Sequence, residues 1–342
     1  KQMSKRRILF LLELMLVICF SGCGSKKETG GEKVTKGSDL SEFVKVDELH
    51  STDAKFYKGK VVTGVDGYLT LLSADGKIEK KYDGIKVNWV DTIEEENILV
   101  YGNFEHETGI VKFDDNQEVI SNEIIMQSQN LQIDPTISLI DGVYYMTVTE
   151  IIGNVNRANE DEENGEYILH FYSSEDLKNW TFISDITDDR HNIEDVDIIN
   201  DGNDIYAVYE KEELDKGNSA IILKKSEDKG QTWSGEIELL PAEADQEPAV
   251  FCKKGNEFVL YYSSDILNKG ESYMGAAIYY AIYDSEFNII KKNQAVASET
   301  PKGILLYDIL KADGYSYMLY AQDYLTTNDL IIERVDNSLL SE

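Results

Sequence analysis

The sequence predicts an all-β protein. Short runs of β-branched and aromatic residues recur along the chain, for example at 144–149 and 258–262. Acid–glycine pairs typical of tight turns separate such runs, as at Asp66-Gly67 and Asp141-Gly142. From residue 44 onward, no stretch long enough for an ordinary helix has a helical apolar period. Together these observations favour strands throughout residues 44–342.

Residues 1–22 predict a secretory signal peptide. Basic residues at the very start of the chain precede an apolar run from Ile8 to Phe20. This run is shorter than the roughly 20 residues that a membrane-spanning helix needs, but its length suits the core of a signal peptide.

Cys23 ends the segment Phe20-Ser21-Gly22-Cys23, which resembles a bacterial lipobox. The resemblance implies cleavage before Cys23 and lipid modification of this cysteine. An ordinary signal peptide with an incidental cysteine is the alternative. Residues 23–43 predict a flexible linker, since residues 25–38 are rich in Gly, Lys, Ser, Thr and Glu. We therefore expect a lipoprotein on the extracytoplasmic face of a bacterial cell membrane.

The charge of the chain restricts its partners. There are 33 basic and 64 acidic residues, a formal net charge of −31. This excess disfavours nucleic acids and anionic lipid surfaces, and it favours neutral or cationic ligands. The expected mature chain has two cysteines, and Cys23 is the expected lipid anchor, so we expect no disulfide within the chain. Cys252 is expected to be a small buried hydrophobic residue. We expect a monomer.

A repeated pattern predicts the arrangement of the strands. Each copy has an acidic residue, an apolar strand, a turn and a second strand. Four copies are clear and two are weaker, and they begin at Asp53, Asp91, Asp134, Asp195, Glu247 and Asp308. The intervals match four-stranded propeller blades of about 40–50 residues with loop insertions. The expected fold is a six-bladed β-propeller, with five blades as the alternative.

In a propeller, the innermost strand of each blade runs along a central channel. Acids that begin successive copies would therefore form a ring at one mouth of this channel. The alternative is that these residues merely begin strands, as Asp often does, and this alternative applies most to Asp53 and Asp308. It is weaker for Asp134 and Glu247, because proline follows each and restricts the backbone of the acid.

Two segments resemble known outer hairpins of propellers. Residues 226–233 read S-E-D-K-G-Q-T-W and match the Asp-box of sialidases and related proteins. The resemblance implies a structural turn between outer strands, with the tryptophan packing back between blades. The residues concerned are Ser226, Asp228, Gly230 and Trp233. A shorter segment with Asp176 and Trp180 resembles the corresponding hairpin of five-bladed glycoside hydrolases of family 43.

Residues 130–265 also resemble family 43 in the segments around three acids. The resemblance implies that Asp134 is the general base, Asp195 a modulator of pKa and Glu247 the general acid. Two departures are that Val196 stands where the family has proline and that no small residue separates Glu247 from its proline. Asp91 would match the family's spacing better as the base. Inverting hydrolysis needs two such carboxyl groups about 6.5–9.5 Å apart.

Further residues are candidates for contacts with a carbohydrate ligand. Asp91 and Asp308 belong to the expected ring of acids. Trp89, Tyr144, Tyr206 and Tyr307 are candidate stacking faces for a sugar, and ordinary strand packing is the alternative for each. The leading hypothesis is hydrolysis of a neutral glycan. A propeller that binds glycan or protein without catalysis is the second.

Other activities find less support in the sequence. An exo-sialidase would need an arginine cluster, whereas the expected mature chain has only Arg157, Arg190 and Arg334, none in a sialidase-like setting. The four histidines show no metal-binding spacing, so no metal or other cofactor is expected. Calcium at the acidic segments 161–166 and 210–215 is an alternative, but these segments lack EF-hand spacing.

Overall fold

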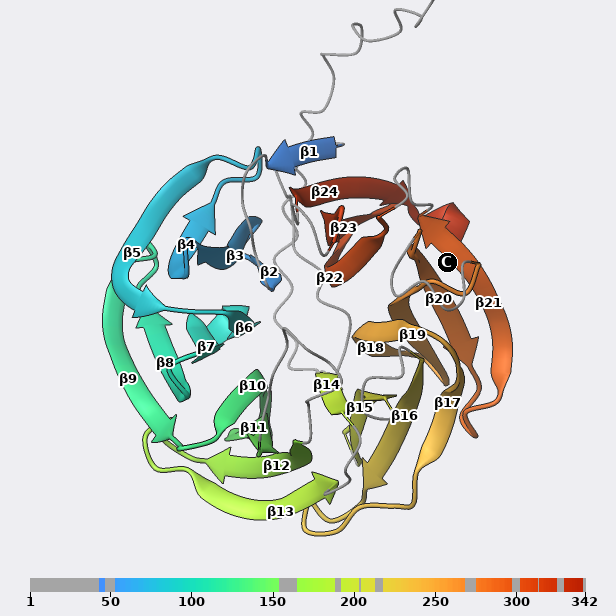
Figure 1. Ribbon diagram of the computed structural model, residues 1–342, viewed down its shortest axis with the longest axis horizontal. Helices are drawn as coiled ribbons and strands as arrows, with labels where there is room; N and C mark the ends of the chain where they lie inside the picture. Colours follow the sequence, from blue (N-terminus) through green and yellow to red (C-terminus); the bar gives the residue numbers. More distant parts are fainter. Residues whose placement is uncertain are drawn as a thin grey trace, which may run out of the picture.

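The computed structural model forms a ring of six four-stranded antiparallel sheets around a central axis (Figure 1). It describes residues 43–46, 53–153, 165–187, 192–202, 204–212, 218–267, 275–296, 302–312, 314–324 and 329–340. The expected signal peptide, Cys23, Arg157, Arg190 and residues 161–164 and 213–215 of the acidic segments lie outside these ranges. The six-bladed propeller is confirmed.

The first three blades follow one another along the chain. Their strands are β2 (Ala54–Tyr57), β3 (Lys60–Val65), β4 (Tyr68–Leu72), β5 (Ile78–Lys86), β6 (Trp89–Ile93), β7 (Ile98–Asn103), β8 (Glu107–Phe113), β9 (Val119–Gln127), β10 (Leu131–Ile140), β11 (Val143–Ile152), β12 (Glu166–Ser174) and β13 (Thr181–Thr187). A single 3-10 turn, η1 (Glu94–Glu96), joins β6 to β7.

The next two blades have the same order, and the sixth uses both ends of the described chain. Their strands are β14 (Asn192–Asn200), β15 (Ile205–Glu212), β16 (Ser219–Ser226), β17 (Ile237–Ala244), β18 (Gln246–Lys254), β19 (Glu257–Ser264), β20 (Ala277–Tyr283), β21 (Ile289–Val296), β22 (Ile304–Ala312), β23 (Tyr315–Gln322) and β24 (Asp329–Asp336), followed by η3 (Asn337–Leu340). Strand β1 (Phe43–Val46) pairs with β24 and so completes the sixth blade from the other end of the chain.

Apolar side chains fill the spaces between the blades. One cluster joins blades three and four through Phe171, Ile193 and Tyr209, each fully buried. This packing follows from strand alternation, which sends successive side chains to opposite faces. Within the described residues, no helix has the length and apolar character needed to cross a membrane.

The Asp-box segment forms the turn between the two outer strands β16 and β17. Asp228 accepts hydrogen bonds from the backbone N–H and the hydroxyl of Thr232 (2.8 and 2.7 Å), and Gly230 N–H donates to Ser226 Oγ (2.7 Å). Trp233 packs edge-on against Phe171 of the preceding blade, with ring centroids 5.3 Å apart. The expected structural turn, with tryptophan packing back between blades, is therefore present.

The hairpin around Asp176 and Trp180 joins β12 to β13 in the same way. Asp176 accepts hydrogen bonds from the backbone N–H groups of Lys178 and Asn179 (2.9 and 2.8 Å). The Trp180 indole donates to the carbonyl of Leu177 (3.0 Å) and packs against the cluster between blades two and three.

Candidate active site at one mouth of the channel

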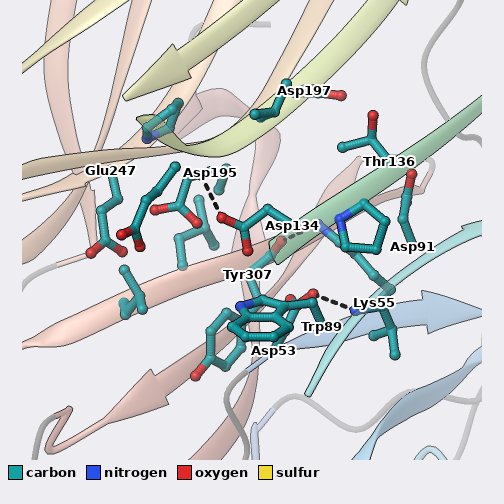
Figure 2. A pocket seen from close by; sticks show the side chains of 18 of the residues that line it. Asp53, Lys55, Trp89, Asp91, Asp134, Thr136, Asp195, Asp197, Glu247 and Tyr307 are labelled. Carbon is teal, nitrogen blue, oxygen red and sulfur yellow. Dashed lines mark hydrogen bonds between the residues drawn. The ribbon is translucent and has the colours of Figure 1, made fainter. Parts of the chain in front are cut away.

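A cavity of about 150 Å³ opens at one mouth of the channel, and the inner strands of all six blades contribute to its wall. Figure 2 shows carboxyl groups from different blades turned towards one another in it. Asp134, Asp195 and Glu247 come from β10, β14 and β18, and Asp91 and Trp89 from β6. The structure thus brings the three predicted catalytic residues together with two of the predicted ligand-binding residues.

Irregularities in the inner strands turn these acids into the cavity. The register of β10 shifts between Ile133 and Thr136, and that of β14 shifts between Glu194 and Asp197. Asp134 and Asp195 lie within these bulges, with left-handed φ values of 47° and 52°. A third shift follows Pro248 in β18. Bulges re-aim side chains and tolerate proline, which explains the prolines beside Asp134 and Glu247.

Each blade is also tied to the next by a hydrogen bond to a backbone N–H of the neighbouring inner strand. Five acceptors are aspartates and one is a serine. The acceptor–donor pairs are Asp53–Val90, Asp91–Ile137, Asp134–Asp195, Asp197–Phe251, Ser263–Leu306 and Asp308–Phe56, at 2.7–3.2 Å. Several acids of the repeat therefore close the ring structurally, a role that repeat spacing alone does not reveal.

Three carboxyl groups form a tight cluster in the wall. Asp195, Glu210 and Glu247 each have an oxygen within 4.8 Å of the others. Burial, followed by the charge of Glu194, raises the pKa of Asp195 to about 7. Burial and the charge of Glu247 raise the pKa of Glu210, while burial and the charge of Asp195 raise the pKa of Glu247. The three carboxyl groups therefore hold their protons to higher pH than isolated carboxyl groups do.

Asp134 is linked to this cluster through Asp195. Its Oδ2 accepts the backbone N–H of Asp195 at 3.2 Å (Figure 2). Burial raises the pKa of Asp134, and the charge of Asp195 adds to the effect. The two aspartates consequently titrate as a pair, and ionisation of one makes ionisation of the other harder.

Among the described residues, Asp195, Glu210 and Glu247 also form a group whose carboxylate oxygens lie close enough together to hold a metal ion. Its three members offer only carboxylate oxygens, which suit a hard cation. Shared protons account for the close approach equally well.

Aromatic residues line one side of the cavity. Trp89 is 7% exposed and meets Phe104 edge-on, with ring centroids 5.0 Å apart. Tyr307 of β22 also lines the cavity and is 6% exposed. Tyr324, which follows β23, is a lining residue that the sequence did not indicate.

Two predicted stacking residues lie elsewhere. The Tyr206 ring is buried in the core between blades four and five, with its centroid 5.2 Å from that of Phe258, and its hydroxyl donates to Asp201. Tyr144 packs against the cluster between blades two and three. Neither lines the cavity. The expectation of sugar stacking is wrong for both because strand alternation turns these rings into blade interfaces.

Asp308 was predicted to bind a ligand at this mouth, but the structure places it elsewhere. It is 4% exposed and lines a second cavity, of about 260 Å³, which adjoins the first one further along the channel. Its two carboxylate oxygens accept the backbone N–H groups of Phe56 and Ile309, both at 2.8 Å. The register shift between Leu306 and Asp308 places Tyr307 at the candidate mouth instead.

Sequence reasoning missed three charged residues of the site. Lys55 and Glu194 line the cavity, and Glu210 lies behind it on β15. Lys55 could have been found, because it is two positions after Asp53 and so shares its side of the strand. Glu210 had been considered only as part of the acidic segment 210–215, and nothing in the sequence placed it beside this cavity, since it belongs to the second strand of its blade.

Known proteins share the fold of this chain without close sequence similarity. The sequence matches no protein-family model and no curated protein. A β-1,2-mannobiose phosphorylase from Listeria innocua superposes with a TM-score of 0.50 and 13% identity, over 90% of this chain and 94% of the other. An α-L-arabinofuranosidase from Lactobacillus brevis gives a TM-score of 0.51 and 15% identity, over 72% and 89%. At such identities, these similarities establish the propeller fold alone.

Proposed function

We propose that this protein is a carbohydrate-active enzyme that hydrolyses glycosidic bonds of a neutral glycan in the candidate cavity. One observation carries the proposal: Asp134, Asp195 and Glu247 come from three blades and line one cavity. The mannobiose phosphorylase and the arabinofuranosidase with similar folds both act on sugars, which supports the choice of substrate class.

Glu247 is the proposed general acid. It is 8% exposed, and burial together with the charge of Asp195 raises its pKa, which favours the protonated form that a general acid needs. Asp134 is the proposed base that removes a proton from water, and Asp91 on the neighbouring blade is the alternative base. Asp195 modulates the titration of both Asp134 and Glu247.

The charges of the cavity favour a neutral substrate over an anionic one. Seven carboxyl groups line it, against the single ammonium of Lys55 among the described lining residues. Arg334 lies on β24 and stacks on Tyr315, 3.9 Å from the ring centroid, rather than in the cavity. An exo-sialidase, which must hold a carboxylate, therefore remains only the weakest alternative.

A screen of chromogenic glycosides tests hydrolysis. The purified protein is assayed on arabino-, xylo- and manno-configured substrates together with Glu247→Gln, Asp134→Asn and Asp91→Asn. We expect Glu247→Gln and one aspartate variant to lose about 10²–10⁴-fold in kcat, the usual contribution of acid–base groups. Glu257→Gln, at an exposed position of β19, is the control. Equal activity of Glu247→Gln and the unmodified protein would refute Glu247 as the acid.

Binding without catalysis is the second candidate. The cavity of about 150 Å³ is small for a ligand pocket, which favours a single sugar or a chain end. Calorimetry with oligosaccharides separates the two functions. Saturable binding without product release supports the binding protein, and turnover supports the enzyme.

We further propose that the protein is a monomeric lipoprotein, anchored through Cys23 to the extracytoplasmic face of a bacterial membrane. The lipobox-like segment and the polar linker after it support this location. Metabolic labelling with an alkyne fatty acid should mark the protein and fail with Cys23→Ser. Labelling that persists in this variant would contradict the assignment.

A further inference from the structure

A groove beside the Asp-box turn lies on the outer rim of the ring, between the third and fourth blades. It has a volume of about 290 Å³, and its wall is formed by β13, β16 and the turn that follows β16. Because β13 is the outermost strand of its blade (Figure 1), the groove opens on the perimeter of the molecule. None of its described lining residues lines the candidate cavity, so the two are separate.

Trp233 gives this groove an aromatic wall. The side chain is only partly buried and lines the groove. Its indole N–H donates to Ser184 Oγ at 3.0 Å, and its ring meets Phe171 edge-on. These two contacts fix the ring and satisfy its polar N–H within the protein, so the ring has apolar surface to offer a ligand. A ring that is already fixed loses little conformational entropy when a ligand binds.

Polar side chains lie around this ring, and two of them are held in place. Asp185 Oδ1 lies 2.6 Å from His170 Nδ1, and Lys224 Nζ donates to the carbonyl oxygen of Ile186 at 2.8 Å. Gln231 is exposed in the turn, and its amide group can both donate and accept hydrogen bonds. The groove therefore combines an aromatic ring with a carboxylate, an ammonium and an amide.

This combination matches the chemistry of a neutral sugar. A sugar ring presents C–H groups on its faces and hydroxyl groups at its edge, and each hydroxyl both donates and accepts hydrogen bonds. Trp233 suits the faces, while Asp185 can accept from hydroxyl groups and Lys224 can donate to them. The described lining residues include one carboxylate and one ammonium, so their charges balance and give no preference for a charged ligand.

We propose that the groove is a second carbohydrate-binding site, which holds a short stretch of a neutral glycan chain on the rim of the propeller. It shares the class of ligand with the proposed function but does not depend on hydrolysis. Two binding sites on one protein increase its retention on a polymeric glycan, because binding at one site raises the effective concentration of the chain at the other.

The three tryptophans make the test specific to each site. Trp233 reports on the groove, Trp89 on the candidate cavity, and Trp180 on the hairpin between β12 and β13. The protein with ¹⁵N-labelled tryptophan is titrated with linear arabinohexaose, xylohexaose and mannohexaose, and the indole N–H signals are followed by NMR. We expect at least one hexasaccharide to shift the Trp233 signal saturably and to leave the Trp180 signal unchanged. If none of the three shifts the Trp233 signal, the proposal is overturned.

Gln231→Ala ties the binding to the groove, since it removes an exposed amide and leaves Trp233 in place. We expect the Kd measured at Trp233 to rise about 3–10-fold, the usual effect of one lost hydrogen bond. The matched control is Gln127→Ala, at an exposed position of β9, which should bind as the unmodified protein does. Equal affinity of Gln231→Ala and the unmodified protein would show that the sugar does not occupy the groove.

The same titration separates the two proposals. If Trp233 shifts but no glycoside is cleaved and the Trp89 signal stays constant, the hydrolase proposal fails and the groove remains a sugar-binding site. If glycosides are cleaved and only Trp89 responds, the candidate cavity is the site of hydrolysis and the groove proposal is refuted.

Discussion

Asp308 and Glu247 both belong to the acids that mark the repeats, yet their carboxyl groups have different surroundings. Both oxygens of Asp308 accept backbone N–H groups, one of them from the first blade. Glu247 instead adjoins Asp195 and Glu210 in the proton-holding cluster. Each residue is more than nine-tenths buried, so burial alone does not distinguish a structural acid from a candidate catalytic acid. The difference lies in the partners of the carboxyl group.

Replacing Asp308 tests its structural role. Asp308→Ala should lower the free energy of unfolding by about 2–4 kcal/mol, because it leaves two buried N–H groups without their acceptor. Asp308→Asn, whose amide oxygen can still accept one of these bonds, should lose less. Urea unfolding measures both variants. Equal losses, or a loss within error of zero for alanine, would contradict the structural role.

The cluster around Glu210 should make stability depend on pH. The pKa of Glu210 is raised in the folded state by burial and by the charge of Glu247. Its contribution to folding is therefore fully present below the unfolded-state pKa and is lost as the pH rises through the folded-state pKa. Glu210→Gln removes this loss and should raise the free energy of unfolding by about 1–3 kcal/mol near pH 8, with a smaller gain near pH 5.

Denaturation of Glu210→Gln at both pH values provides the measurement. The control is Glu257→Gln, which changes the charge equally at an exposed position. If Glu210→Gln gains the same stability at both pH values, or loses stability near pH 8, then Glu210 does not carry an unfavourable charge in the folded protein.

At the scale of single elements, the outer hairpins could be read from the sequence and the inner-strand bulges could not. The Asp-box keeps its turn residues in one continuous segment, so the hydrogen bonds of Asp228 and Ser226 are encoded locally. A bulge is a mismatch between two strands and leaves no mark in the alternation of either strand alone. The prolines at positions 135 and 248 were the only local sign of the bulges.

Gly230 tests how tightly the Asp-box hairpin packs. A Cβ on Gly230 would lie 2.1 Å from Cε1 of Phe171, and its φ of 84° disfavours any side chain. Gly230→Ala should therefore cost about 2–4 kcal/mol of unfolding free energy, from overpacking and from backbone strain. Gly142→Ala is the matched control, since Gly142 has a similar φ of 80° but open space around it. It should cost only about 1–2 kcal/mol. Similar losses in the two variants would show that the contact with Phe171 is unimportant.

At the scale of the whole molecule, repeat spacing predicted the blade number and which inner strands bring acids to the channel. It did not predict the side of the channel that each residue faces. Tyr206 and Asp308 were misplaced because one register shift or one step of alternation moves a side chain to another surface. The pairing of β1 with β24 was also not predicted, because β1 comes from the far end of the chain and belongs to no repeat.

Closure of the ring by β1 leads to a prediction for truncated chains. Phe43 pairs with Glu333 and Val46 with Leu330, so β1 covers the edge of β24, whose residues Leu330 and Ile332 are at most 1% exposed. A chain that begins at residue 47 would lose these backbone hydrogen bonds and leave the β24 edge open. We expect an unfolding free energy lower by about 2–4 kcal/mol and a tendency to self-associate, compared with a chain that begins at residue 40. A synthetic peptide covering residues 40–50 should restore part of the loss. Equal stability of the two truncated chains, measured by urea unfolding and light scattering, would show that five complete blades and a three-stranded sixth hold the ring without β1.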